Sequence, residues 1–121
     1  MARILIADEH PMTRLALRLL LQEQLHSIVG EARDGLEALS LAASLTPDLL
    51  IIDLDLSRIT GLDVISHLRA RGVRFAQGWL FSRPIGIEAL STCLAEAACL
   101  ARDFPDTLIV LNHAGLPSDR S

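Results

Sequence analysis

The chain has 121 residues, of which 50% are hydrophobic and 21% are charged, and its formal net charge is −4. This length predicts one domain over residues 1–121, and the high apolar content excludes an intrinsically disordered chain. The acidic balance and the scarcity of aromatic residues argue against a nucleic-acid partner.

Short apolar runs alternate with amphipathic segments along the first half of the chain. The first run ends in acids at Asp8 and Glu9, as is typical of a buried strand whose carboxyl end meets solvent. Pro11 then suits the first turn of a helix. The expected elements are, in order, a strand over 4–7, a helix over 12–24, a strand over 27–31, a helix through 36–43 that stops before Pro47, and a uniformly apolar strand over 49–52.

The second half continues the alternation but lacks one element. We expect a loop over 55–61, a helix from 62 that ends at Gly72, a strand over 79–81, a helix over 87–102 and a strand over 108–111. The tail over 112–121 contains Gly115 and Pro117. These residues disfavour a helix after the last strand.

Continuously apolar strands that alternate with helices predict a parallel sheet covered on both faces. We therefore expect a flavodoxin-like α/β fold, an open doubly wound five-stranded sheet of order 2-1-3-4-5 with its C-terminal helix missing. The missing helix would leave apolar side chains of the last two strands exposed, which predicts a homodimer or a higher homo-oligomer. A half-barrel whose two copies close into one barrel is the alternative.

No apolar run is long enough to span a membrane, and we expect no secretion signal and no membrane partner. Cys93 and Cys99 lie in an apolar helical pattern and are interpreted as thiols of a reducing compartment. A cytoplasmic location is therefore expected.

Three carboxylates are expected to converge at one edge of the sheet. Asp8 and Glu9 follow the first strand and Asp53 follows the third, and the predicted order makes these strands neighbours. Such a group favours a hard divalent cation such as Mg²⁺, and an aspartate held by the cation can attack phosphorus. The alternative is that the acids are polar caps that only terminate parallel strands.

Residues 1–72 resemble the receiver domain of two-component response regulators. The resemblance is carried by ILIADEHPMTR, IVGEARDGLEAL, PDLLIIDLDL and GLDVISHLRARG, which are typical of the subclass with a helix-turn-helix output module. It implies that Asp53 is the phosphoacceptor and that a sensor kinase is the partner. It also implies that Asp8 and Glu9 hold Mg²⁺ together with the main-chain carbonyl of Asp55.

Beyond Gly72 the chain departs from the receiver pattern. Receivers have a Thr or Ser after the fourth strand, where Ser82 could stand in, and a Lys after the fifth strand. All eleven basic residues of this chain are arginines, and Asn112 occupies the approximate place of the lysine. Ser57 replaces a proline that is usual in the family.

Residues 73–121 are instead expected to be a βαβ part derived from barrel proteins. Residues 76–95 resemble the last βα unit of EAL-type cyclic-dinucleotide phosphodiesterases, and residues 96–121 resemble a segment of the amidohydrolase superfamily. Neither segment carries the catalytic set of its family. These resemblances favour a mosaic or engineered chimera joined near Gly72.

Three functions are compatible with these features. The favoured hypothesis is a chimeric or designed scaffold that is not an enzyme and retains an acidic Mg²⁺ cleft. The alternative is a working receiver that accepts a phosphoryl group on Asp53, with no DNA-binding output of its own. The third is a hydrolase that uses a metal at His113, and a related hypothesis places His10, His113 and Asp8 around one metal ion.

Overall fold

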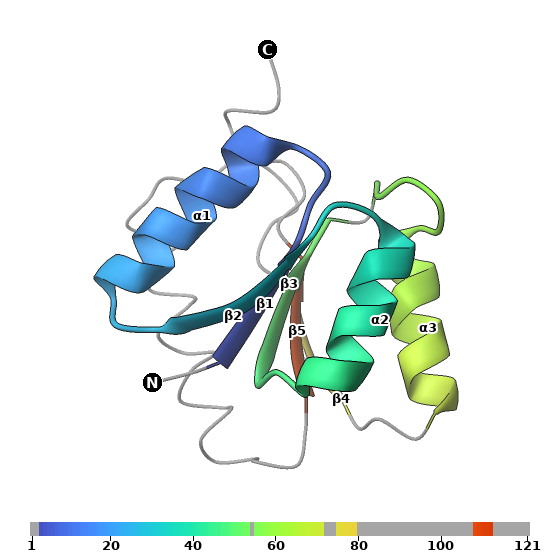
Figure 1. Ribbon diagram of the computed structural model, residues 1–121. Coiled ribbons are helices and arrows are strands. Elements are labelled where there is room, and N and C mark those ends of the chain that lie inside the picture. The colour runs from blue at the N-terminus through green and yellow to red at the C-terminus, as the bar shows by residue number, and fades with distance from the viewer. Residues whose placement is uncertain (1–2, 54, 72–74, 80–107, 113–121) are drawn as a thin grey trace.

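The computed structural model describes residues 3–53, 55–71, 75–79 and 108–112, and they form strands and helices in strict alternation up to Trp79. Figure 1 shows a central sheet with helices on both sides. The first six elements confirm the predicted sequence of strands and helices, with bounds that differ by at most two residues. The elements are β1 (Arg3–Ala7), α1 (Pro11–Glu23), β2 (Ser27–Ala32), α2 (Gly35–Leu45), β3 (Leu49–Ile52), α3 (Gly61–Ala70), β4 (Phe75–Trp79) and β5 (Leu108–Asn112).

Local side-chain chemistry sets the starts of the helices. Pro11 occupies the first turn of α1, where its missing N–H costs no hydrogen bond. The Asp34 carboxylate caps α2 by accepting from the Glu37 N–H at 2.8 Å. Thr60 and Asp63 form a capping box at the start of α3. Both α2 and α3 therefore begin at fixed residues close to the carboxyl edge of the sheet.

All strand pairs are parallel, and the sheet has the order β2-β1-β3-β5-β4. Alternate residues of β1 and β3 face opposite sides. Leu5, Leu50 and Ile52 belong to the core cluster that α2 and α3 cover, whereas Ile4 and Ile51 are equally buried but lie outside that cluster. In the described residues, α1 lies on the opposite side of the sheet from α2 and α3 (Figure 1). The flavodoxin-like α/β class is therefore correct.

The predicted strand order was wrong at one edge. β5 pairs with β3, and among the described strands β4 pairs only with β5, so the last two strands exchange their expected places. The physical reason lies in their composition. β5 (LIVLN) is apolar and suits a position between two strands, whereas β4 (FAQGW) contains Gln and Gly, which are better tolerated at an edge. β4 also begins at Phe75, before the predicted start at Trp79.

The predicted helix over 87–102, the cysteines within it and the tail after Asn112 lie outside the described residues. The missing closing helix and the homo-oligomer therefore stay predictions. Among the described helices, none has the length and apolar character that a membrane span requires.

A close backbone contact holds the loop between β3 and α3 against α2. The Gly35 N–H donates to the Ser57 carbonyl at 3.0 Å. A Cβ built on Gly35 would lie 2.0 Å from the carbonyl oxygen of Ile59. Arg58, between these two residues, has φ of 74°, a left-handed conformation that arginine disfavours. This loop directly follows β3. Its contacts with the start of α2 therefore also hold the backbone after that strand in place.

Gly35→Ala is expected to destabilise the fold by about 2 kcal/mol, because the new methyl group meets backbone atoms that can move only with the whole loop. Gly30→Ala is the matched control. Its Cβ would meet the end of the flexible Leu45 side chain at 2.9 Å, which can rotate away at small cost. Urea unfolding of both variants measures the difference. Equal stability losses would show that the Gly35 contact does not constrain the loop.

His26 makes the stability of the fold sensitive to acid. Partial burial lowers its pKa below the ordinary value of 6.5, and the positive N-terminus adds to this effect. The folded state therefore disfavours the protonated ring, so stability is lost as the pH falls below 6.5 toward the folded-state pKa.

We expect His26→Gln to lose less stability than the parent chain between about pH 7.5 and about pH 5.5. His67→Gln, at an exposed position on α3, serves as the control and should follow the parent. Urea unfolding at the two pH values measures the change in the free energy of unfolding. An unchanged pH dependence in His26→Gln would contradict the prediction.

Candidate functional site

The parallel ladder between β1 and β3 brings two aspartates to the same edge of the sheet. The register pairs Ala7 with Ile52, the last residues of the two strands. The ladder then continues for one residue, because the Asp53 N–H donates to the Ala7 carbonyl at 3.0 Å. On the other side, the Asp8 N–H donates to the Ala32 carbonyl of β2, also at 3.0 Å. Asp8 and Asp53 are therefore neighbours at the carboxyl edge, as predicted.

Both carboxylates are withdrawn from solvent. Asp8 is 0% exposed and Asp53 is 8% exposed. Each accepts the main-chain N–H of the residue two positions later: Asp8 Oδ1 from His10 at 2.8 Å, and Asp53 Oδ1 from Asp55 at 3.1 Å. These are Asx turns, which orient an aspartate where the chain leaves a strand. The two turns fix both acidic groups next to each other.

His10 makes a second contact with Asp8. Its ring Nδ1 lies 3.0 Å from Asp8 Oδ1, the oxygen that also accepts the His10 main-chain N–H. The His10 side chain is 56% exposed and belongs to the residue that precedes α1. The ring therefore reaches the buried carboxylate from the solvent side.

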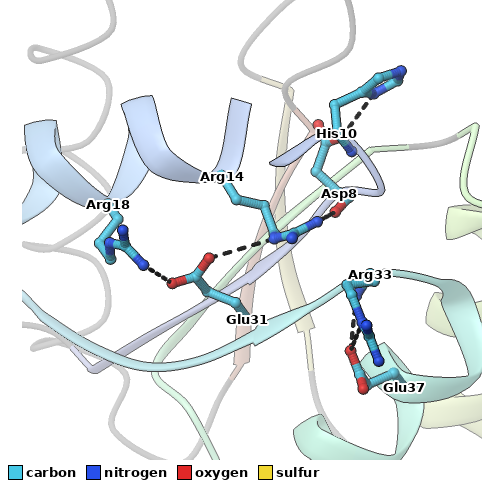
Figure 2. A network of polar contacts seen from close by, with 7 residues as sticks. All are labelled: Asp8, His10, Arg14, Arg18, Glu31, Arg33 and Glu37. Atoms are coloured by element: carbon cyan, nitrogen blue, oxygen red, sulfur yellow. Dashed lines mark hydrogen bonds and ion pairs between the residues drawn. The ribbon is translucent and has the colours of Figure 1, made fainter. Parts of the chain in front are cut away.

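Arg14, on α1, contacts both Asp8 and Glu31, as Figure 2 shows. Its NH1 group donates to the Asp8 carbonyl oxygen at 2.7 Å, and its Nε lies 3.4 Å from Glu31 Oε1. Arg18 holds the other oxygen of Glu31 at 2.9 Å. The Arg14 side chain is only 13% exposed, so this ion pair is shielded from water more than a surface pair. The network ties α1 and β2 to the backbone of Asp8.

The donor set fits a divalent cation. One ligand atom from each of Asp8, His10 and Asp53 can be chosen so that all lie within 4.8 Å of one another. Two carboxylates that share so small a space repel each other unless a cation is bound between them, and carboxylate oxygens are the ligands that Mg²⁺ prefers.

The other predicted site residues differ in where they lie relative to this donor group. Glu9 is exposed and is not part of the donor group among the described residues. Asp55 is exposed, and its N–H holds Asp53. Asn112 pairs with Ile52 in the strand beside β3, which puts it at the same edge. Ser82 and His113 lie outside the described residues.

Two parts of the site were not predicted from the sequence. The role of Arg14 and Glu31 was missed, because these residues are distant in sequence and no motif links them. The proximity of His10 to Asp8 was predicted only as part of a site shared with His113. The local signal that could have shown the contact is the Asp-x-His spacing, because an Asx turn at Asp8 brings the residue two positions later back to its carboxylate.

Comparison with known proteins gives one consistent family. The family model described as "Response regulator receiver domain" matches residues 4–78. A putative transcriptional regulator of Pseudomonas aeruginosa is 47% identical over 70 residues, which are 58% of this chain and 34% of that protein. The nitrate/nitrite response regulator NarL of Escherichia coli is 37% identical over 73 residues, which are 60% of this chain and 34% of that protein. The match thus spans about a third of these relatives' length.

Solved structures show the same fold. The signal receiver domain of a putative LuxO repressor protein from Vibrio parahaemolyticus has a TM-score of 0.71 at 17% identity, over 86% of this chain and 95% of that one. The chemotaxis response regulator CheY4 of Vibrio cholerae has a TM-score of 0.68 at 22% identity, over 80% of this chain and 98% of that one. The phosphodiesterase and amidohydrolase resemblances and the chimeric origin gain no support from these comparisons.

Asp53→Asn is expected to stabilise the metal-free fold by about 1 kcal/mol, because it removes one of two adjacent buried negative charges. The new amide oxygen can still accept from the Asp55 N–H. The same variant should lose any stabilisation that Mg²⁺ gives the parent. Asp48→Asn, at the opposite edge of the sheet, is the control for a lost charge. Thermal unfolding in EDTA and in Mg²⁺ gives both values, and a less stable Asp53→Asn in EDTA would show that the carboxylates do not repel.

Proposed function

The chain belongs to the response regulator receiver domain family, and on this premise we propose that it accepts a phosphoryl group on Asp53. The observation that carries the proposal is the pairing of two buried aspartates, Asp8 and Asp53, at the carboxyl edge of β1 and β3. In parallel α/β sheets this edge is where ligands bind. A structural polar cap has no need of two adjacent acids that both avoid solvent.

In the proposed reaction, a carboxylate oxygen of Asp53 forms a bond to phosphorus. The bond between phosphorus and the leaving group of the donor breaks, and the leaving group keeps the electron pair. The Asp55 N–H at 3.1 Å holds the Asp53 carboxylate in one orientation. Burial removes most of the water that would otherwise surround the nucleophile.

Asp8 and Asp53 are the proposed Mg²⁺ ligands, and we assign Glu9 and the main-chain carbonyl of Asp55 as the further donors that the family pattern implies. Mg²⁺ held by these residues would neutralise charge that develops on the phosphoryl oxygens. Arg14 supports this site without entering it, because its hydrogen bond to the Asp8 carbonyl keeps the Asp8 backbone in place.

The chain has no lysine that could pair with a bound phosphoryl group. Asn112, at the end of the strand beside β3, carries no charge, and Ser82 is the hydroxyl we propose for the switch. We therefore expect phosphoryl acceptance to survive, while the coupling of phosphorylation to conformational change is weaker than in a receiver that has the lysine.

The partner implied by this function is a sensor kinase, and the compartment we propose is the cytoplasm. The chain is then a phosphoryl acceptor and not an enzyme with a substrate of its own. The homo-oligomer expected from the sequence is retained as part of the proposal. An inert scaffold is the competing function, and phosphorylation distinguishes the two.

Incubation with Mg²⁺ and acetyl phosphate should add the mass of one phosphoryl group to the parent chain, as measured by intact-mass spectrometry. The adduct should be base-labile, as expected for an acyl phosphate, and absent from Asp53→Asn. Asp34→Asn is the matched control, because asparagine keeps the cap of α2 and the charge change is the same.

EDTA should suppress the adduct on the parent. A folded parent chain that gains no adduct would favour the inert scaffold. An adduct that persists on Asp53→Asn would place the acceptor elsewhere.

A further inference from the structure

The structure adds an imidazole nitrogen to a site whose other donors are oxygens. His10 Nδ1 lies 3.0 Å from Asp8 Oδ1, and donors from His10, Asp8 and Asp53 lie within 4.8 Å of one another. Of the histidines on the described residues, His10 alone belongs to this group; His67 instead contacts the Asp63 carbonyl on α3.

These donors lie close enough together to share one cation. With metal–ligand bonds of about 2.1 Å, adjacent ligands of an octahedral ion lie about 3.0 Å apart and opposite ligands about 4.2 Å apart. His10 Nδ1 and Asp8 Oδ1 lie 3.0 Å apart in a hydrogen-bond contact, and donors from His10, Asp8 and Asp53 lie within 4.8 Å of one another. For Nδ1 to bind the cation that Asp8 binds, the ring must turn so that the Nδ1 lone pair faces the cation instead of Asp8 Oδ1, and the solvent exposure of the His10 side chain permits that rotation.

The backbone of His10 is already held in place for this role. Its N–H donates to Asp8 Oδ1, and its carbonyl accepts from the Arg14 N–H at 3.1 Å in the first turn of α1. Only the ring torsions remain to be ordered when a cation binds. The entropic cost of recruiting this ligand is therefore small.

We propose that His10 is a direct ligand of the divalent cation and shifts the preference of the site from Mg²⁺ toward cations that accept nitrogen, such as Ni²⁺ and Zn²⁺. Imidazole binds these ions well, whereas Mg²⁺ favours oxygen. This inference rests on the proposed function, because that function is what places a divalent cation between Asp8 and Asp53.

Pulsed EPR of Mn²⁺ bound to the tag-free chain tests the ligand directly, because a coordinated imidazole nitrogen modulates the electron spin echo. We expect the nitrogen modulation in the parent and in His67→Asn, and its loss in His10→Asn. Asparagine is a favoured residue at the start of a helix, so His10→Asn should fold as well as the parent. His113→Asn is measured in parallel, since it removes the other histidine that the sequence suggested for this site.

The selectivity is tested by calorimetric titration of the same chains with Ni²⁺ alone and with Mg²⁺ alone. Replacing residues that merely orient metal ligands typically weakens affinity by about 10-fold or more, and loss of a ligand should do at least as much. We therefore expect the ratio of Ni²⁺ to Mg²⁺ affinity to fall about 10-fold in His10→Asn and to stay unchanged in His67→Asn.

The outcomes separate this inference from the function on which it rests. Mn²⁺ binding without nitrogen modulation in the parent would overturn the role of His10 and leave the phosphoryl acceptor intact. Modulation that disappears in His113→Asn but persists in His10→Asn would do the same. Absence of any Mn²⁺ or Mg²⁺ binding would overturn both proposals.

Discussion

Two buried carboxylates side by side are the constraint on which the rest of this structure depends. Asp8 and Asp53 have 0% and 8% exposure and follow paired strands, so the backbones that carry these charges cannot separate without breaking the ladder between β1 and β3. Isolated buried charges are among the costliest features a fold can contain. Main-chain hydrogen bonds offset part of this cost, since each carboxylate accepts the N–H of the residue two positions later.

The same constraint explains why the loops around the site are held so firmly. After β1, Arg14 binds the Asp8 carbonyl and is itself held by Glu31. After β3, the loop rests on Gly35 so closely that no side chain fits there. The core formed by α2, α3 and the sheet supports the second loop, and α1 with β2 supports the first. A site with such support changes little on its own, as pre-organised binding of a charged group requires.

Sequence patterns predicted the first half of the fold because burial there follows simple periodicity. β1 and β3 are uninterrupted apolar runs, and acids mark their ends, so both the strands and the meeting of Asp8 with Asp53 could be predicted. The fourth strand was predicted too late in the chain, because Gln77 and Gly78 interrupt the apolar pattern of β4. The order of β4 and β5 was wrong because sequence order does not state which strand suits an interior position. The contact between Arg14 and Glu31 depends on tertiary packing, and no local pattern encodes it.

The lack of lysine changes the balance of charge that a phosphoryl group would meet at this site. Asn112, beside the end of β3, is neutral. The Arg14 guanidinium already donates a hydrogen bond to the Asp8 carbonyl and forms an ion pair with Glu31. Among the residues that the structure describes, positive charge for a phosphoryl group at the acidic cluster would then come mainly from the bound cation. In a receiver with the lysine, cation and lysine share that task. Here cation occupancy would control phosphoryl acceptance more steeply, and a nitrogen ligand such as we infer for His10 would change which cation supplies that charge.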